Sequence, residues 1–103
     1  MDFIKGEITA YCFMVQRGKP AAMMPIQERF REGVINFVTN QELQVYTEPL
    51  AEGWVALWIY KYPHILDVIK NIPQTPSSVF DHWILGKLFG YEESAIQEFV
   101  TKV

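Results

Sequence analysis

The side chains of this 103-residue chain best suited to acid–base chemistry are its two histidines, each of which has an aspartate close by. His64 precedes Asp67 by three residues, and His82 directly follows Asp81. Either pair could move a proton or bind a small ligand if the helices predicted to start near residues 63 and 79 lay side by side. The sequence contains no HxxxH, HExxH or CxxC spacing, so it predicts no metal, no cofactor and no catalytic site.

The one cysteine, Cys12, lies in an apolar run and cannot form an internal disulfide. A catalytic thiolate needs an activating neighbour, which Cys12 lacks in the local sequence, so we expect a buried free thiol in a reducing compartment. Charges near the N-terminus do not fit a signal peptide, and no uncharged apolar run approaches the roughly 20 residues of a membrane span. We therefore expect a cytoplasmic protein without membrane contact.

Aromatic residues make up 15% of the chain, which is many for so small a core to bury. Several share one face of a strand predicted over residues 54–62, because side chains alternate along a strand. These are Trp54, Trp58, Tyr60 and Tyr62. The aliphatic residues between 55 and 59 are expected to face the core. The aromatic face could be a partner-binding surface, a platform for nucleic-acid bases, or an ordinary face covered by C-terminal helices.

Residues 84–99 have the spacing of a helix-turn-helix, with a small residue at Gly86 and a turn glycine at Gly90. The second helix of this hairpin is mainly acidic, and its one cation is Lys102. Its acidic residues are Glu92, Glu93 and Glu98. The net charge is −3, and no basic stripe that would hold phosphates is visible. The sequence therefore argues against a nucleic-acid partner and favours a structural or protein-binding hairpin. The acidic face of this hairpin could mimic the charge of a nucleic acid or meet a basic partner surface.

Hydrophobic patterning predicts a single α+β domain over residues 1–103 with the element order ββαββααα. A strand over residues 7–16 would form a hairpin with the apolar run 21–26, although a helix fits the spacing of Ile4, Ile8, Tyr11, Cys12 and Val15 as well. An amphipathic helix follows over about residues 25–40, with Pro25 in its first turn. A second hairpin pairs residues 43–48 with 54–62. The two hairpins would form a four-stranded antiparallel sheet crossed by the helix.

Three short helices complete the predicted fold: one from Pro63 to near Asn71, one over residues 79–89 and one after Gly90. Ser78 and Asp81 have the spacing of a capping box for the middle helix. Gly90 suits the left-handed position just past its end.

The segments 18–22, 58–66 and 82–91 give the chain its likeness to known sequences. Through them it resembles small uncharacterised proteins of Gram-positive bacteria and their phages. The resemblance implies no activity, and it favours an accessory protein of a phage or mobile element.

These observations favour a non-enzymatic domain that binds a partner protein, or itself as a homodimer. The expected contact residues are Trp54, Trp58, Tyr60, Tyr62, His64, Tyr91, Glu92 and Glu93. The first alternative is a small helix-turn-helix regulator that meets phosphates through Lys87, Lys102, Arg29 and Arg31. The second is a small-ligand binder or minor enzyme that uses His64 or His82.

Overall fold

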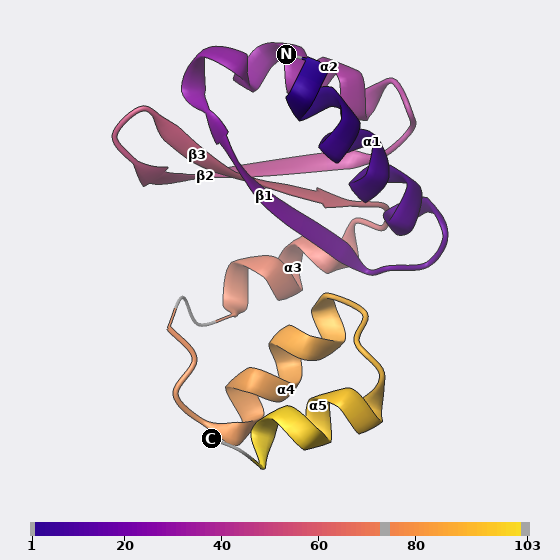
Figure 1. The fold of residues 1–103 in the computed structure, drawn as a ribbon, viewed down its shortest axis with the longest axis vertical. Helices are drawn as coiled ribbons and strands as arrows, with labels where there is room; N and C mark the ends of the chain where they lie inside the picture. The colour runs from indigo at the N-terminus through magenta and orange to yellow at the C-terminus, as the bar shows by residue number, and fades with distance from the viewer. Residues whose placement is uncertain (1, 73–74, 102–103) are drawn as a thin grey trace.

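The computed structural model describes residues 2–72 and 75–101, over which the chain forms five α-helices and one three-stranded sheet (Figure 1). The elements are α1 (Asp2–Gln16), β1 (Ala21–Gln27), the 3-10 turn η1 (Glu28–Phe30), α2 (Arg31–Thr39), β2 (Gln44–Ala51), β3 (Trp54–Tyr60), α3 (His64–Asn71), α4 (Val79–Leu88) and α5 (Glu93–Val100). The α+β class is confirmed. The predicted order ββαββααα is wrong, because the first element is a helix.

Residues 7–16 form part of α1 and not a strand. The segment is rich in β-forming side chains, but its buried residues recur every three or four positions, which is the period of a helix. Ile8, Cys12 and Val15 are almost completely buried against the sheet, whereas Phe13 and Met14 between them are exposed. Burial of this apolar stripe outweighs the weaker intrinsic β preference of the segment. The alternative helical interpretation is therefore the correct one.

The predicted helix over residues 25–40 is too long at its N-terminal end. Its first residues belong to β1, and α2 begins only at Arg31, after η1. Ala22, Met24 and Ile26 all contribute to one core, as alternate residues of a strand do. Pro25 lies in this edge strand, where a missing backbone N–H is tolerated. Its resemblance to a helix-starting proline was therefore misleading.

The sheet has the order β1-β3-β2 and is antiparallel throughout. In the central strand β3, Ile59 lies opposite Ala22 of β1 and Val45 of β2. β2 and β3 form the second predicted hairpin, which turns at Gly53 with a φ of 78°. The sheet has three strands instead of the predicted four, since residues 7–16 are helical.

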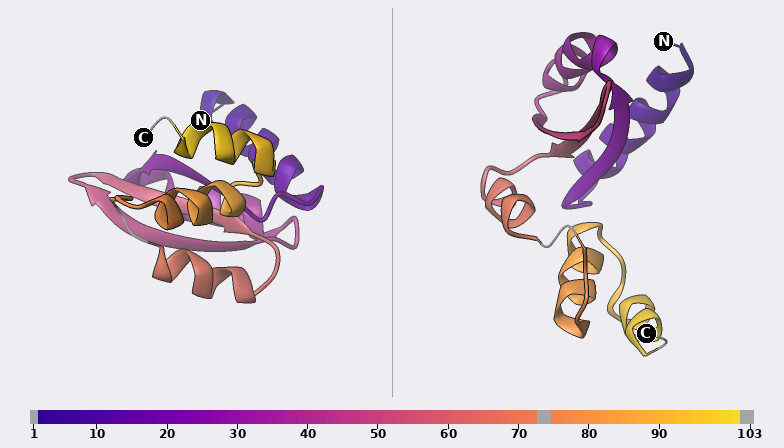
Figure 2. Two further views of the ribbon diagram at one scale, coloured as in Figure 1. Left: turned by 90° about the horizontal axis from the view of Figure 1, so that it is seen from below. Right: turned by 90° about the vertical axis from the view of Figure 1, so that its left-hand side faces the viewer.

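Helices cover both faces of the sheet, in layers of unequal size (Figures 1 and 2). The larger core lies between the sheet and the helices α1 and α2, and residues 55, 57 and 59 of β3 enter it as predicted. The smaller core lies on the opposite face, where Trp58 and Tyr60 pack with Ile69 of α3 and Leu88 of α4. α4 joins this layer through Leu88 and forms with α5 a hairpin at the far end of the molecule from α2 (Figure 1).

The three C-terminal helices are confirmed, and so are the signals that delimit α4. The Ser78 hydroxyl accepts a hydrogen bond from the Asp81 N–H, and the Asp81 carboxylate accepts one from the Ser78 N–H, which is the predicted capping box. Gly90 has a φ of 80° just past the end of α4. Lys102 lies outside the described residues. Within residues 2–72 and 75–101, every helix is too short or too polar to cross a membrane.

Candidate interaction surface

The middle of the aromatic face of β3 is buried within the protein itself. Trp58 is only 6% exposed and Tyr60 only 3%. The Trp58 ring stacks on Phe89 with their centroids 5.7 Å apart, and its Nε1 donates a hydrogen bond to Glu48 Oε1 at 3.0 Å. In this fold, Trp58 and Tyr60 are therefore core residues and offer no surface to a partner.

The exposed aromatic side chains at the two ends of β3 are well separated. Trp54 stands at the β2–β3 turn, whereas Tyr62 lies beyond the opposite end of the strand. At about 3.3 Å per residue, β3 alone places them roughly 20 Å apart. Tyr62 stacks on the exposed His64 with their ring centroids 6.0 Å apart. The structure thus divides the predicted aromatic face into two small exposed patches and a buried centre.

Helix α4 carries apolar side chains in every direction around its axis. Leu88 points into the smaller core and Gly86 is buried against α5, but Val79, Phe80 and Trp83 are exposed. Phe80 is 67% exposed. A helix without a polar face is normally buried on all sides. In α4, however, three large apolar side chains face solvent where polar ones would be expected. One of the alternatives drawn from the sequence was that the C-terminal helices cover the aromatic face of the sheet. The missing polar face of α4 was the signal that Phe80 and Trp83 would not take part in that cover.

The α4–α5 hairpin is held closed by small residues. A Cβ atom added to Gly86 would lie only 2.7 Å from Cγ1 of Ile96, so any larger residue would force Ile96 or the α5 helix to shift. A Cβ at Gly90 would meet the Pro20 ring at 3.3 Å, which places the turn of the hairpin against the segment before β1. Both glycines therefore fix the hairpin geometry, as the helix-turn-helix spacing suggested.

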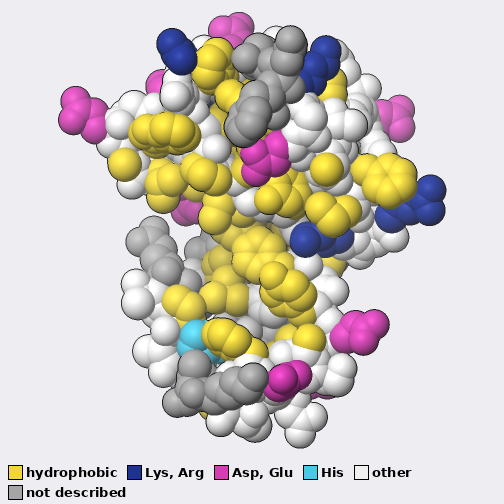
Figure 3. Space-filling view, in the orientation of Figure 1, with side chains coloured by type: hydrophobic (Ala, Val, Ile, Leu, Met, Phe, Trp, Pro, Cys, Tyr) yellow, Lys and Arg dark blue, Asp and Glu magenta, His cyan; other side chains and the backbone are white. Residues whose placement is uncertain are grey.

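An apolar groove of about 430 Å³ runs between α4 and α5. It is lined by His82, Leu85, Gly86, Phe89, Tyr91, Ala95, Ile96 and Phe99. The His82 imidazole packs edge-on against Phe99 at 5.2 Å. Leu85 and Phe89 also line a second groove, between α4 and the sheet. Figure 3 shows hydrophobic side chains gathered over the hairpin and continuing onto the sheet.

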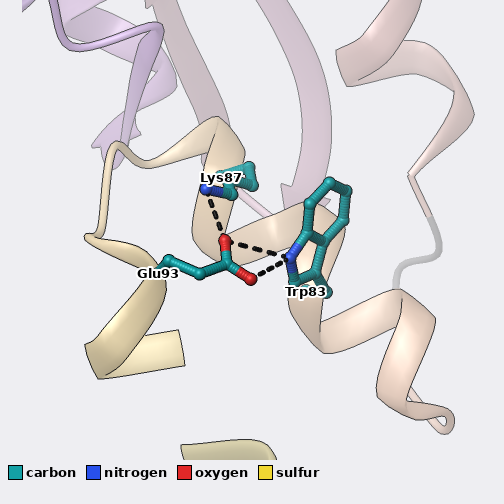
Figure 4. Close-up of polar contacts among 3 residues, drawn as sticks. All are labelled: Trp83, Lys87 and Glu93. Atoms are coloured by element: carbon teal, nitrogen blue, oxygen red, sulfur yellow. Dashed lines mark hydrogen bonds and ion pairs between the residues drawn. The ribbon is translucent and has the colours of Figure 1, made fainter. Parts of the chain in front are cut away.

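A polar network joins the two helices (Figure 4). Glu93 at the start of α5 receives the Lys87 ammonium at 2.5 Å and the Trp83 Nε1–H at 3.0 Å. These hydrogen bonds from Lys87 and Trp83 hold the pKa of Glu93 below its usual value. Among the predicted contact residues in the hairpin, the Glu93 carboxylate is thus already bound by Lys87 and Trp83. The side chains of Tyr91 and Glu92 are exposed.

The predicted acid–base pairs are not assembled. The Asp81 carboxylate accepts hydrogen bonds from the backbone N–H groups of Ser77 and Ser78, which lower its pKa and use it as a helix cap. Among the described residues, no hydrogen bond or ion pair joins His64 to Asp67, and His, Cys, Asp and Glu nowhere form a group of three that could hold a metal. Cys12 is buried, as expected, and this burial raises the pKa of its thiol.

α4 and α5 form two helices joined by a glycine turn, but the phosphate contacts expected of a helix-turn-helix regulator are dispersed. Lys87 is engaged by Glu93, and Arg31 pairs with Glu28 at 3.3 Å. Arg29 lies in η1 and Arg31 is the first residue of α2, at the opposite end of the molecule from α5 (Figure 1). A DNA-binding regulator therefore stays an alternative function that the structure does not favour.

Comparison with protein-family models, with curated proteins and with solved structures finds no match to this chain.

Proposed function

We propose that this chain is a small non-enzymatic interaction domain that binds a partner protein through its C-terminal α4–α5 hairpin. The observation that carries the proposal is an apolar helix, α4, left without cover on two sides. Phe80 is exposed on one side, and the groove that ends at Phe99 is open on the other. Exposed aromatic clusters of this kind dominate the energetics of protein–protein contacts.

The rest of the chain supports this role as a scaffold. The Cys12 thiol is buried and the Asp81 carboxylate caps a helix, so both groups have a structural role. The free thiol supports a cytoplasmic location. The likeness to small proteins of Gram-positive bacteria and their phages supports a role as an accessory protein of a phage or mobile genetic element. A self-associating hairpin is the second form that this function could take.

Affinity capture from the native host with matched variants tests the proposal. Phe99→Ser removes an exposed aromatic side chain from the hairpin, and Phe13→Ser removes one of equal exposure from α1, since the two are 53% and 54% exposed. We expect the wild type and Phe13→Ser to capture the same partner, and Phe99→Ser and Phe80→Ser to lose at least about ninety per cent of it, as hot-spot truncations do.

Light scattering on the same four proteins reports self-association. A dimer that Phe99→Ser or Phe80→Ser dissociates would support the self-associating form. If both hairpin variants capture and assemble like the wild type, the hairpin is not the interaction surface and the proposal is wrong.

A further inference from the structure

We propose that the groove between α4 and α5 binds the apolar side of an amphipathic helix that carries Lys or Arg residues on its flanks, presented by a partner protein. This inference rests on the proposed function, because it names the partner chemistry of the same hairpin. It is carried by the shape of the groove together with the charge around it.

The groove has the dimensions of a site for two turns of helix. Its lining residues recur every three or four positions along both helices, so it follows them from end to end. At 1.5 Å per residue, the ten residues of α4 and the eight of α5 extend about 15 and 12 Å. Anchor side chains at positions i, i+4 and i+7 of a bound helix span roughly 10 Å. A short amphipathic helix could therefore fill the groove with three apolar side chains.

Acidic side chains border the α5 wall of this groove. Glu98 lies three residues after Ala95, a groove-lining residue, and so on the same side of the helix. Glu92 directly follows Tyr91, which lines the groove where α5 begins. A partner helix whose apolar face enters the groove would bring its flanking residues next to these carboxylates. Cations at those flanks are attracted and anions are repelled.

The charge of the hairpin as a whole has the same sign. Residues 79–103 contain four carboxylates and two lysines in the sequence, Lys102 and Lys87, of which Lys87 is engaged by Glu93. A cation from outside the hairpin, Lys19, belongs to the segment that lies beside Gly90 at the turn. The positive flank of the partner is therefore expected along α5, away from the turn.

This charge distribution selects among the possible occupants. A second copy seated in the groove would bring two acidic hairpins together, and a nucleic acid would bring phosphates to the same carboxylates. Both arrangements place like charges side by side, which costs free energy and lowers association rates. A basic amphipathic helix is the occupant that matches both the apolar walls and the acidic rim.

Three synthetic helical peptides of about 14 residues, roughly 21 Å when helical, provide the probes. The first has leucines on one face and lysines elsewhere, the second has glutamates in place of the lysines, and the third scrambles the leucine–lysine sequence so that no apolar face remains. Fluorescence anisotropy of labelled peptide against the full chain gives the affinities. We expect the first peptide to bind at least about tenfold more tightly than either other peptide, and added salt to weaken its binding.

Two tryptophan substitutions on α5 separate groove binding from general attraction to an acidic protein. Ala95→Trp fills the groove, whereas Gln97→Trp places the same side chain about 200° around the helix, on the side away from Ala95. We expect Ala95→Trp to weaken binding of the leucine–lysine peptide at least about tenfold and Gln97→Trp to leave it unchanged. Phe99→Ser, which removes one wall, repeats the test without added bulk, and circular dichroism confirms that each variant is folded.

Several outcomes would overturn the inference. Equal binding of the scrambled peptide, or binding that ignores Ala95→Trp and Phe99→Ser, would show only non-specific attraction. Equal binding of the leucine–glutamate peptide would remove the role of charge. A dimer that Ala95→Trp dissociates would identify a second copy as the occupant. In that case, or if host capture still depends on Phe80 and Phe99 while no peptide binds, the proposed function stands and this inference fails.

Discussion

The two helical layers on the sheet use apolar residues in opposite ways. In α1, the apolar side chains that meet the sheet form one stripe, and Ile8, Cys12 and Val15 in it are buried almost completely. In α4, the apolar side chains surround the helix, and of its ten residues only Gly86 and Leu88 are buried. A helix at the surface of a protein usually buries its apolar stripe and exposes its polar face, and α1 follows this relation. α4 does not follow it, because apolar side chains lie on its exposed sides as well.

The difference shows where most of the strongly exposed aromatic side chains lie, since Phe13 and Tyr62 are the other two that are more than half exposed among the described residues. Trp58 and Tyr60 of β3 are buried in the smaller core. Phe80, Tyr91 and Phe99 are not, because each remains more than half exposed. The layer formed by α1 and α2 stabilises the fold, whereas the hairpin keeps apolar surface that the fold does not need for itself.

The largest test of this contrast is a pair of truncations, one in each layer. Leu57→Ala empties a fully buried site under α1 and α2 and should lower the free energy of unfolding by about 2–5 kcal/mol. Phe80→Ala removes a larger side chain that already faces solvent and should change it by no more than about 0.5 kcal/mol. Urea denaturation followed by circular dichroism measures both. A comparable loss in the two variants would mean that the outer side of α4 contributes to the core, and the contrast would fail.

A second test asks whether the hairpin can be loosened without the sheet. Gly86→Ala places a methyl group 2.7 Å from Ile96 Cγ1, and we expect this overpacking to cost about 1–3 kcal/mol within the hairpin. Gly6→Ala, in α1, is the matched control, because its methyl group meets no atom within 4 Å and should gain about 1 kcal/mol of helix propensity. Amide hydrogen exchange should show lost protection in α5 of Gly86→Ala, with the amides of β3 unchanged. Equal protection in both variants would contradict a hairpin closed by Gly86.

The sequence predicted the parts of the fold whose signals are local. The capping box at Ser78 and Asp81, the left-handed Gly90 and the β2–β3 hairpin all depend on residues a few positions apart, and all are present. The first strand and the long helix from Pro25 were wrong because their patterns were ambiguous. Ile26 fits a helical stripe with Phe30 and also fits a strand, and only pairing with Val55 of β3 decides between them.

The candidate site was predicted in part for a similar reason. Alternation along residues 54–62 places side chains on faces correctly, and Val55, Leu57 and Ile59 are in the larger core as expected. Which aromatic side chains the C-terminal helices then cover depends on tertiary packing, since Phe89 stacks on Trp58 while Phe99 does not reach the sheet's core. The all-round apolar character of α4 was visible in the sequence and is the feature that best locates the exposed surface.

The smallest expected effect lies in the cap of α4 and has a defined dependence on pH. Hydrogen bonds from the backbone N–H of Ser77, and then from Ser78, lower the pKa of Asp81 in the folded chain. Their contribution is therefore fully present above the pKa that Asp81 has in the unfolded chain, about 3.9, and is lost as the pH falls through the lower folded value. As the pH is lowered from 7 to 3, the protection factors of the α4 amides, which correct for the slower intrinsic exchange at low pH, should begin to fall before those of β3.

Asp81→Asn and Ser78→Ala sharpen that last test. Asp81→Asn should remove the pH dependence that is specific to α4, whereas Ser78→Ala should cost about 1 kcal/mol of helix stability at neutral pH. Both changes lie at the start of α4, away from the sheet, so the exchange of β3 amides serves as the internal control. If Asp81→Asn retains the α4-specific pH dependence, another group controls it. If α4 and β3 lose protection together in every variant, the hairpin and the sheet unfold as one unit, and their separate roles would have to be abandoned.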